Sequence, residues 1–332
     1  MKVAVVGATG IVGETLLSVL EERAVPVARL TALASHGRKG AVRFRGVALD
    51  VQATDAQTLS GHDAVFFAGG EDASSAFAPA LARDGTVVID NSATYRNTDG
   101  VPLLVPEINA QTLHPDDRIF PVANCTAIIL CMALAPVRDL CGLSRVHVAT
   151  YQAVSGAGRA GLEELAAAES ALARDEAEPA SVTFTAPIAR NIIPRIGEID
   201  ASGYSGEESK VCAETRKILA LPNLPISAIC VRVPVRRAHC EAVFFETESA
   251  ASCASLAAAL RAATGVVFHE HGIVTPRAVE GHDDIHVARL RTEDESGQRF
   301  AMWIAGDQLR KGAATNGVQI LELLLARGLV RA

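Results

Sequence analysis

Residues 2–22 read KVAVVGATGIVGETLLSVLEE, and this stretch decides the fold of the N-terminal part of the chain. The β-branched run Lys2–Val6 predicts a buried strand, and Glu14–Glu22 carries apolar residues at helical spacing. The turn between them, Gly7–Gly13, has glycine at every third position. A strand, a glycine turn and a helix in this order let backbone N–H groups approach a pyrophosphate. The stretch therefore predicts the first βα unit of a dinucleotide-binding domain.

The glycine turn is expected to supply the main cofactor contacts. The same spacing also arises where a strand and a helix only pack closely, so the flanking strand and helix carry much of the argument. We predict that the dinucleotide contacts Gly7, Thr9, Gly10, Ile11, Val12 and Gly13.

More apolar runs in the first third of the chain predict further strands, with helical patterns between several of them. These runs are Leu30–Ala34, Ala64–Ala68, Thr86–Asp90 and Arg118–Pro121. Strands that alternate with helices are typical of a doubly wound parallel sheet of the Rossmann type. We therefore expect an α/β fold.

The loop after the second strand bears on the choice of cofactor. It has no Asp or Glu to accept the ribose 2′-hydroxyl of NAD, and it reads ASHGRKG over residues 34–40. A hydroxyl and two cations suit a 2′-phosphate, which favours NADP. The residues predicted to take part are Ser35, Gly37 and Arg38. A solvated basic loop is the alternative.

The pattern changes after residue 124. Helices are expected at about Thr126–Leu140 and Ala160–Arg174, with a turn of small residues at Ser155–Gly158. Strands are expected at Ser144–Tyr151, Ile226–Pro234, Ala242–Glu248, Val266–His269, His286–Thr292 and Arg299–Ala305. Strands with few helices between them favour an antiparallel α+β domain.

The last helical pattern, Ala313–Leu329, is expected to return to the first domain. The predicted domains are therefore residues 1–124 with 307–332, and residues 125–306.

Length and composition exclude several classes of protein. The chain has 332 residues, 49% of them hydrophobic and 21% charged, so two ordinary globular domains are expected. A formal net charge of -7 argues against a nucleic-acid partner. No apolar run reaches membrane-spanning length, and the N-terminus does not resemble a secretory signal. Seven cysteines without a Cys-x-x-Cys pair favour free thiols in a reducing cytoplasm, and no metal is needed.

Cys125 is the strongest candidate for a catalytic residue. It follows Asn124 and begins an apolar segment that is predicted to be helical. The free N–H groups and the dipole of a helix N-terminus favour a thiolate, which is the nucleophilic form of cysteine. A buried cysteine that only fills space is the alternative.

Three later residues are further candidates. Gln152 ends a predicted strand beside the turn of small residues, and His239 lies in a strand-like segment. A lone histidine in such a segment is more often structural. Arg232 stands among apolar residues, where an unpaired guanidinium is costly to bury. It is therefore either paired within the protein or placed to receive a carboxylate.

Several long strings together resemble the aspartate-β-semialdehyde dehydrogenase family, over nearly the whole chain from Val3 to Leu324. They are NCT at 124–126, YQAVSGAG at 151–158, RVPV at 232–235 and LRKGAA at 309–314, with DNS at 90–92, VPE at 105–107, PIA at 187–189 and ETRKIL at 214–219. The resemblance implies NADPH-dependent reductive dephosphorylation of L-4-aspartyl phosphate to L-aspartate 4-semialdehyde. This reaction serves lysine, threonine, methionine and isoleucine biosynthesis.

The resemblance also implies roles for individual residues. Cys125 would be the nucleophile, a nearby His239 imidazolium would act as acid and base, and Gln152 would orient the acyl group. Arg232 would hold the substrate α-carboxylate, Glu207 its ammonium group, and Arg96 and Lys210 the departing phosphate, with Asn124 also at the substrate. Ser155, Gly156 and Gln308 would contact the cofactor. A homodimer or homotetramer through the second domain is also implied.

Two other functions remain open at this stage. N-acetyl-γ-glutamyl-phosphate reductase uses the same thioester chemistry on a longer, acylated substrate, but the strings at 151–158 and 232–235 speak against it. A catalytically silent paralogue would be expected to lose the nucleophile, and Cys125 is present.

Overall fold

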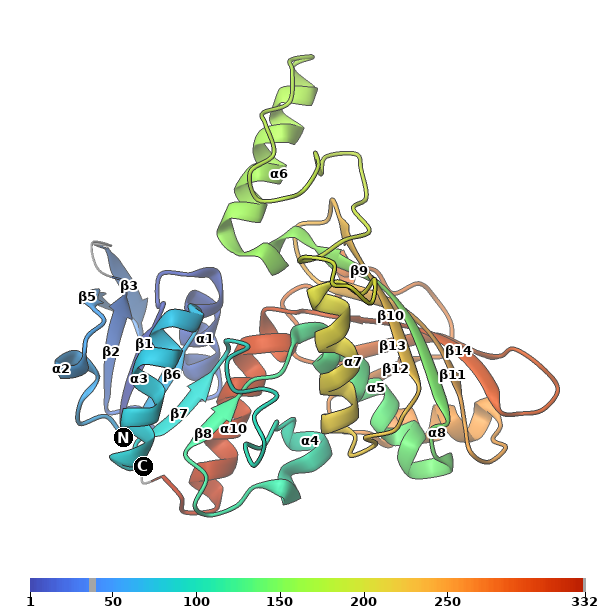
Figure 1. Cartoon of the computed structure of the whole chain (residues 1–332), viewed down its shortest axis with the longest axis horizontal. Helices are drawn as coiled ribbons and strands as arrows, with labels where there is room; N and C mark the ends of the chain where they lie inside the picture. The colour runs from blue at the N-terminus through green and yellow to red at the C-terminus, as the bar shows by residue number, and fades with distance from the viewer. Residues whose placement is uncertain (36–39, 331–332) are drawn as a thin grey trace. The chain divides into compact units, whose positions relative to one another are not determined.

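The computed structural model describes residues 1–35 and 40–330, and the chain divides into two compact units (Figure 1). Unit 1 comprises Met1–Asn124 and Gly312–Ala332, and unit 2 comprises Cys125–Lys311. Residues 307–311, expected with the first domain, group with unit 2. The predicted cofactor residues Gly37 and Arg38 lie outside the described residues.

Unit 1 is built on a parallel sheet with the strand order β5-β2-β1-β6-β7-β8. From the central strand β1 the chain first builds outward on one side and then returns to build on the other, which confirms the doubly wound fold predicted from the sequence. The strands are β1 (Lys2–Val6), β2 (Arg29–Ala34), β5 (Gln52–Ala53), β6 (Ala64–Phe67), β7 (Val87–Asp90) and β8 (Ile119–Pro121).

Helices and a small hairpin complete unit 1. The helix α10 packs against α1, α4 and β7, so the C-terminal segment belongs to this unit. The helices are α1 (Ile11–Glu22), α2 (Ala56–Leu59), α3 (Glu71–Arg83), α4 (Pro106–Asn109) with η1 (Ala110–Thr112), and α10 (Thr315–Ala326). The hairpin of β3 (Ala41–Phe44) and β4 (Val47–Asp50) was not predicted, although Arg45-Gly46 at its tip has the positive φ angles of a two-residue hairpin turn.

The glycine turn brings β1 and α1 close together. Gly7 has φ +79°, a conformation that glycine adopts without steric cost. A Cβ on Gly13 would lie 2.2 Å from the carbonyl oxygen of Gly7, so no larger residue fits there. The spacing of these glycines therefore has a direct packing reason.

Unit 2 contains a mixed sheet with the order β10-β9-β11-β14-β13-β12. The expectation of an antiparallel sheet was wrong for two pairs, because β10 runs parallel to β9 and β12 runs parallel to β13. A long connection between β9 and β10 allows the chain to return in the same direction. The strands are β9 (Arg145–Ala153), β10 (Ile226–Val233), β11 (His239–Glu246), β12 (Val266–His269), β13 (Ile285–Thr292) and β14 (Arg299–Gly306).

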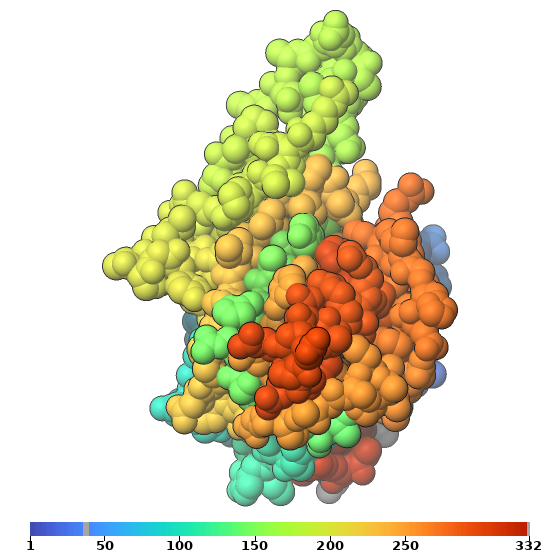
Figure 2. Space-filling model, turned by 90° about the vertical axis from the view of Figure 1, so that its right-hand side faces the viewer, coloured from blue at the N-terminus to red at the C-terminus, as the bar shows by residue number. Residues whose placement is uncertain are grey.

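Helices cover one face of this sheet. The helix α5 contacts β13 and β14, α7 contacts β10, and α8 contacts β12 and β13. On the other face, strands β9 and β14 lie at the surface, and α6 projects from the body of the unit (Figure 2). The helical segments are α5 (Cys125–Cys141), η2 (Val154–Ala157), α6 (Gly158–Ala173), α7 (Gly206–Ile218), α8 (Cys253–Ala262), α9 (Pro276–Val279) and the π-helical turn Arg310–Ala314.

Candidate active site

Three of the predicted site residues lie at the same end of three neighbouring strands of the second sheet. Gln152 is near the end of β9 and is directly paired with Arg232 on β10. His239 begins β11, which runs antiparallel to β9 on its other side. The three side chains are 1%, 5% and 0% exposed, respectively. Neighbouring strands thus bring Gln152 together with two residues that lie 80 and 87 positions later in the sequence.

Cys125 begins helix α5 and is only partly buried, whereas the following two turns of the helix are fully buried. The positive end of the helix dipole therefore lies at the sulfur. Arg232 and Cys125 interact electrostatically, which places the guanidinium charge within reach of the thiol. Asn124, directly before the helix, is buried. Cys125 therefore combines partial access with a positive environment, the combination that makes a cysteine nucleophilic.

Arg232 is a buried cation with capacity for a ligand. One of its guanidinium nitrogens, Nη1, donates a hydrogen bond of 2.6 Å to the Ala153 carbonyl. Burial lowers the pKa of Arg232, while Glu207 and Cys125 oppose this shift, and the guanidinium stays charged near neutrality. Within residues 1–35 and 40–330, Arg232 forms no ion pair within 4 Å. A buried guanidinium with no carboxylate in direct contact is suited to a bidentate carboxylate.

Gln152 is held in one orientation by its neighbours. Its Nε2 donates to Glu207 Oε1 at 3.0 Å, and its Oε1 accepts from the Thr150 hydroxyl at 3.0 Å. The Thr150 hydroxyl in turn accepts from the backbone N–H of Val231 at 3.2 Å. Sequence reasoning missed Thr150, although strand alternation places residues 150 and 152 on the same face.

Glu207 comes from the first turn of α7. This helix starts with a capping box formed by Ser205 and Glu208, which fixes where the first turn lies. Glu208 also accepts a hydrogen bond of 2.9 Å from the backbone of Cys230 on β10, which ties the helix start to the sheet. Lys210 follows one turn later and is partly buried.

His239 is neutral in this environment, which differs from the expected imidazolium. Burial lowers its pKa well below the ordinary range, and the Arg232 charge acts in the same direction. Its Nδ1 accepts a hydrogen bond of 3.1 Å from the Ala153 N–H, so the neutral ring carries its proton on Nε2. That Nε2 is buried and has no hydrogen-bond partner among the residues described. The ring therefore presents one N–H donor.

Gly156 lies directly behind two of these side chains. A Cβ on this residue would lie 2.6 Å from Nη1 of Arg232 and 3.3 Å from Cε1 and Nε2 of His239. The neighbouring residue Ser155 accepts a hydrogen bond from Gln308, whose other amide end accepts from the backbone of Ala238. The turn of small residues thus packs behind the site.

The remaining predicted residues lie in unit 1. Arg96 is 9% exposed and donates a hydrogen bond of 2.8 Å to the Asn91 carbonyl. The helix that follows the glycine turn starts at Ile11, and its N-cap residue, Gly10, provides no side-chain cap for the first N–H groups. Ser35 is exposed after β2.

Metal-binding clusters and membrane-spanning helices are absent from the described part of the chain. In the described part of the chain, no three His, Cys, Asp or Glu side chains are grouped so that they could hold a metal ion. No helix in those residues combines the length and apolar character needed to cross a membrane. All seven cysteines are free thiols.

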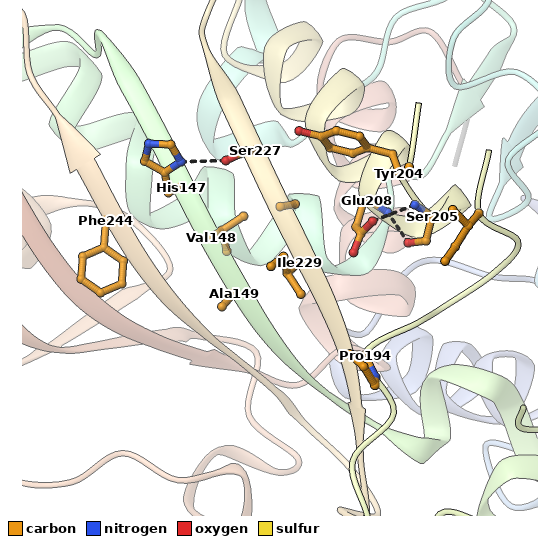
Figure 3. Close-up of a pocket in the computed structure, with 13 residues that line it drawn as sticks. His147, Val148, Ala149, Pro194, Tyr204, Ser205, Glu208, Ser227, Ile229 and Phe244 are labelled. Carbon is orange, nitrogen blue, oxygen red and sulfur yellow. Dashed lines mark hydrogen bonds between the residues drawn. The ribbon is translucent and has the colours of Figure 1, made fainter. Parts of the chain in front are cut away.

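A separate hollow lies on the uncovered face of the second sheet (Figure 3). It has a volume of about 660 Å³, and residues such as Ile229, Tyr204 and Phe244 line it. His147 and Ser227 are joined across β9 and β10 by a hydrogen bond of 2.7 Å. None of Cys125, Gln152, Arg232 and His239 lines this hollow, which is therefore distinct from the cluster of candidate site residues.

Comparisons with known proteins identify the family of this chain. Residues 2–115 match the semialdehyde dehydrogenase NAD-binding domain, and residues 134–311 match the semialdehyde dehydrogenase dimerisation domain. Aspartate-semialdehyde dehydrogenase of Aquifex aeolicus is 40% identical over 99% of both chains, and aspartate-semialdehyde dehydrogenase 2 of Vibrio cholerae is 41% identical over 97% of both.

A solved structure gives the same result. The crystal structure of aspartate semialdehyde dehydrogenase II from Vibrio cholerae, complexed with ASA, has a TM-score of 0.94 and 37% identity, with 98% of each chain covered. The chain described here belongs to the aspartate-semialdehyde dehydrogenase family.

Proposed function

We propose that this protein reduces L-4-aspartyl phosphate to L-aspartate 4-semialdehyde with NADPH, releasing inorganic phosphate. The observation that carries the proposal is the buried Arg232, which has no ion-pair partner in the described residues yet acts electrostatically on Cys125. A guanidinium in this setting is suited to the α-carboxylate of an amino acid whose acyl carbon reaches the sulfur.

The polar groups around Arg232 suit the rest of an amino-acid substrate. Glu207 would bind the α-ammonium, and its carboxylate is already hydrogen-bonded to Gln152 at 3.0 Å. Gln152 keeps a second amide hydrogen for the acyl oxygen. Lys210, Arg96 and Asn124 are proposed to contact the phosphoryl end and the acyl group. An N-acylated substrate would lack the cation that Glu207 favours.

The covalent step takes place at Cys125. Its thiolate attacks the acyl carbon, an S–C bond forms, and the C–O bond to phosphate breaks with its electron pair on the departing phosphate. The Nε2–H of neutral His239 donates a hydrogen bond to the oxygen of the tetrahedral adduct and so stabilises its charge. Bound NADPH would supply the hydride that reduces the thioester, after which Cys125 leaves as the thiolate.

The glycine turn of unit 1 fits the pyrophosphate of such a cofactor. Helix α1 has Gly10 as its N-cap and therefore no side-chain cap, which suits an anion at its first N–H groups. We propose contacts from Gly7, Thr9, Gly10, Ile11, Val12 and Gly13, with Ser155 and Gly156 at the other end of the cofactor. We also propose that Ser35, Gly37 and Arg38 favour NADP over NAD.

We further propose that the protein is a cytoplasmic homodimer. Seven free thiols suit a reducing compartment. The uncovered face of the second sheet carries large exposed apolar side chains, including Ile229, Phe244 and Tyr151. A second copy on this face would cover them, in keeping with the matched dimerisation domain.

The direct test is a substrate comparison with purified protein. We expect NADPH oxidation with L-4-aspartyl phosphate, and phosphate-dependent NADP reduction with the semialdehyde. N-acetyl-γ-glutamyl phosphate should give a rate at least about 100-fold lower, because its acylated nitrogen cannot pair with Glu207. Faster turnover of the acetylated substrate, or no turnover of either, would refute the proposal. NADH in place of NADPH measures the preference at the 2′ position.

A further inference from the structure

The residue directly before His239 has an unusual backbone. Ala238 has φ +71°, in the left-handed region where a Cβ is sterically unfavourable. Its side chain is fully buried in a small core with Cys240 and Ala305. A left-handed alanine persists only where its surroundings hold it. The contacts of this segment therefore bear on where the His239 ring lies.

The side chains of Asp307 and Gln308 hold residues 237–238 in place. Strands β11 and β14 end their ladder at the pair His239 and Gly306. Beyond this pair, the Ala238 N–H donates to Gln308 Oε1 at 2.8 Å, and Arg237 Nε donates to Asp307 Oδ2 at 2.7 Å. Side chains thus continue the hydrogen bonding where the backbone ladder stops.

The other end of the Gln308 amide reaches the turn behind the site. Its Nε2 donates to the Ser155 hydroxyl, and the Ser155 N–H donates to the Arg236 carbonyl at 3.2 Å. At Gly156, the next residue, a Cβ would lie 3.3 Å from the His239 ring. Gln308 is 2% exposed, and both ends of its amide are used within the protein. One buried amide therefore joins the residue before His239 to the turn behind it.

We propose that Gln308 is a positioning residue for His239, acting through the left-handed Ala238. This inference rests on the proposed function for the role of His239 in the reaction. It differs from a direct contact between Gln308 and the nicotinamide carboxamide, which the family resemblance implies. The two roles lead to different results when the amide is removed.

The test replaces the amide with a side chain of similar length. Gln308→Met should lower kcat with L-4-aspartyl phosphate by about 10- to 100-fold, because a shift of the ring by about 1 Å has effects of this size. The dissociation constant of NADPH should stay within about twofold of wild type. Hydrogen exchange of a peptide that spans residues 237–239 should become faster in the protein without cofactor, because Ala238 loses its acceptor.

A second substitution separates positioning from cofactor contact. Glycine adopts φ +71° without the Cβ penalty, so Ala238→Gly in the Gln308→Met background should restore kcat by about threefold or more. The matched control is Gln298→Met. Gln298 precedes β14 as Gln308 follows it, and its amide also bonds two groups, the carbonyls of Thr247 and Glu248. This control should leave kcat and exchange at 237–239 unchanged.

The outcomes are distinct. An increased NADPH dissociation constant in Gln308→Met, with unchanged exchange and no rescue by Ala238→Gly, would overturn the positioning role in favour of cofactor contact. Unchanged kcat and exchange would overturn it outright. An inactive wild type would instead refute the proposed function, and in that case the exchange measurement still tests the hydrogen bond to Ala238.

Discussion

Two cysteines on helix α5 have opposite environments. Cys125 is the first residue of the helix, partly accessible and under the influence of the Arg232 charge. Cys131 lies on the same helix but is fully buried. Burial raises the pKa of the Cys131 thiol, and Glu241 adds to the shift. The comparison shows that position along the helix, and not residue type, decides whether a thiol can act as a nucleophile.

The largest expected effect comes from exchanging each thiol in turn. Cys125→Ser should lower kcat by about 10³-fold or more, because a hydroxyl is a far weaker nucleophile than a thiolate. NADPH binding should persist. Cys131→Ser should keep kcat within about threefold of wild type and lower the free energy of unfolding by about 1–3 kcal/mol, because the hydroxyl is buried. Steady-state kinetics and denaturant unfolding measure both. Equal losses of kcat would remove the distinction between the two thiols.

Placing a side chain at Gly156 tests whether the environment of Cys125 depends on the positions of Arg232 and His239. Gly156→Ala places a Cβ 2.6 Å from Arg232 Nη1 and 3.3 Å from the His239 ring, so at least one must move. We expect kcat/KM to fall by about 10- to 100-fold. Alkylation of Cys125 by iodoacetamide should also slow, because the guanidinium moves relative to the sulfur. Thermal unfolding checks that the variant is folded. Wild-type kinetics would mean that the cluster tolerates displacement.

Substitution of Thr150 is expected to lower kcat by a smaller factor, because Thr150 acts through its hydrogen bond to Gln152. Thr150→Val removes the donor to Gln152 Oε1 and the acceptor of the hydrogen bond from the partly buried Val231 N–H. We expect kcat to fall by about tenfold and stability by about 1–3 kcal/mol. Thr150→Ser keeps the hydroxyl and is the matched control, with kcat near wild type. If both variants lost the same activity, shape and not the hydroxyl would be responsible.

The smallest effect is the pH dependence of stability that Cys131 causes. In the unfolded chain this thiol ionises near its ordinary value of 9.0, whereas burial raises its pKa in the folded protein. Above pH 9 the folded state therefore binds more protons than the unfolded state, and stability falls as pH rises, by at most about 1.4 kcal/mol per pH unit for one thiol. Cys131→Ala should make the loss of stability above pH 9 less steep in urea unfolding. An unchanged slope would show that Cys131 does not contribute.

Local patterns were enough for much of the fold. The first βα unit, the start of α5 near Cys125 and most strand positions follow from short-range spacing. The β3–β4 hairpin was missed because its turn, Arg45-Gly46, is not one of the usual asparagine–glycine signals. The parallel pairing of β9 and β10 was missed because it depends on a connection between strands that is far longer than any local pattern.

The site shows the same division. Motifs and family resemblance predicted four site residues, Cys125, Gln152, Arg232 and His239. The structure places the last three at the same end of the neighbouring strands β9, β10 and β11. The neutral state of His239 was not predictable, because its pKa is lowered by burial and by the charge of Arg232 on another strand. The position of its proton depends on a hydrogen bond from the Ala153 N–H, which is equally distant in sequence. The contacts of Gln308 with Ser155 and Ala238 are equally distant in sequence.

Unit 1 is made from both ends of the chain, and this has a consequence for its folding during translation. Its sheet is made from the first strands to leave the ribosome, but α10, which packs on α1, α4 and β7, is translated last. The nascent nucleotide-binding half must therefore wait, with that face uncovered, until the whole of unit 2 has been synthesised. The chain is synthesised in the order of its elements, but unit 1, which begins first, can be completed only after the last residues of unit 2 have been made.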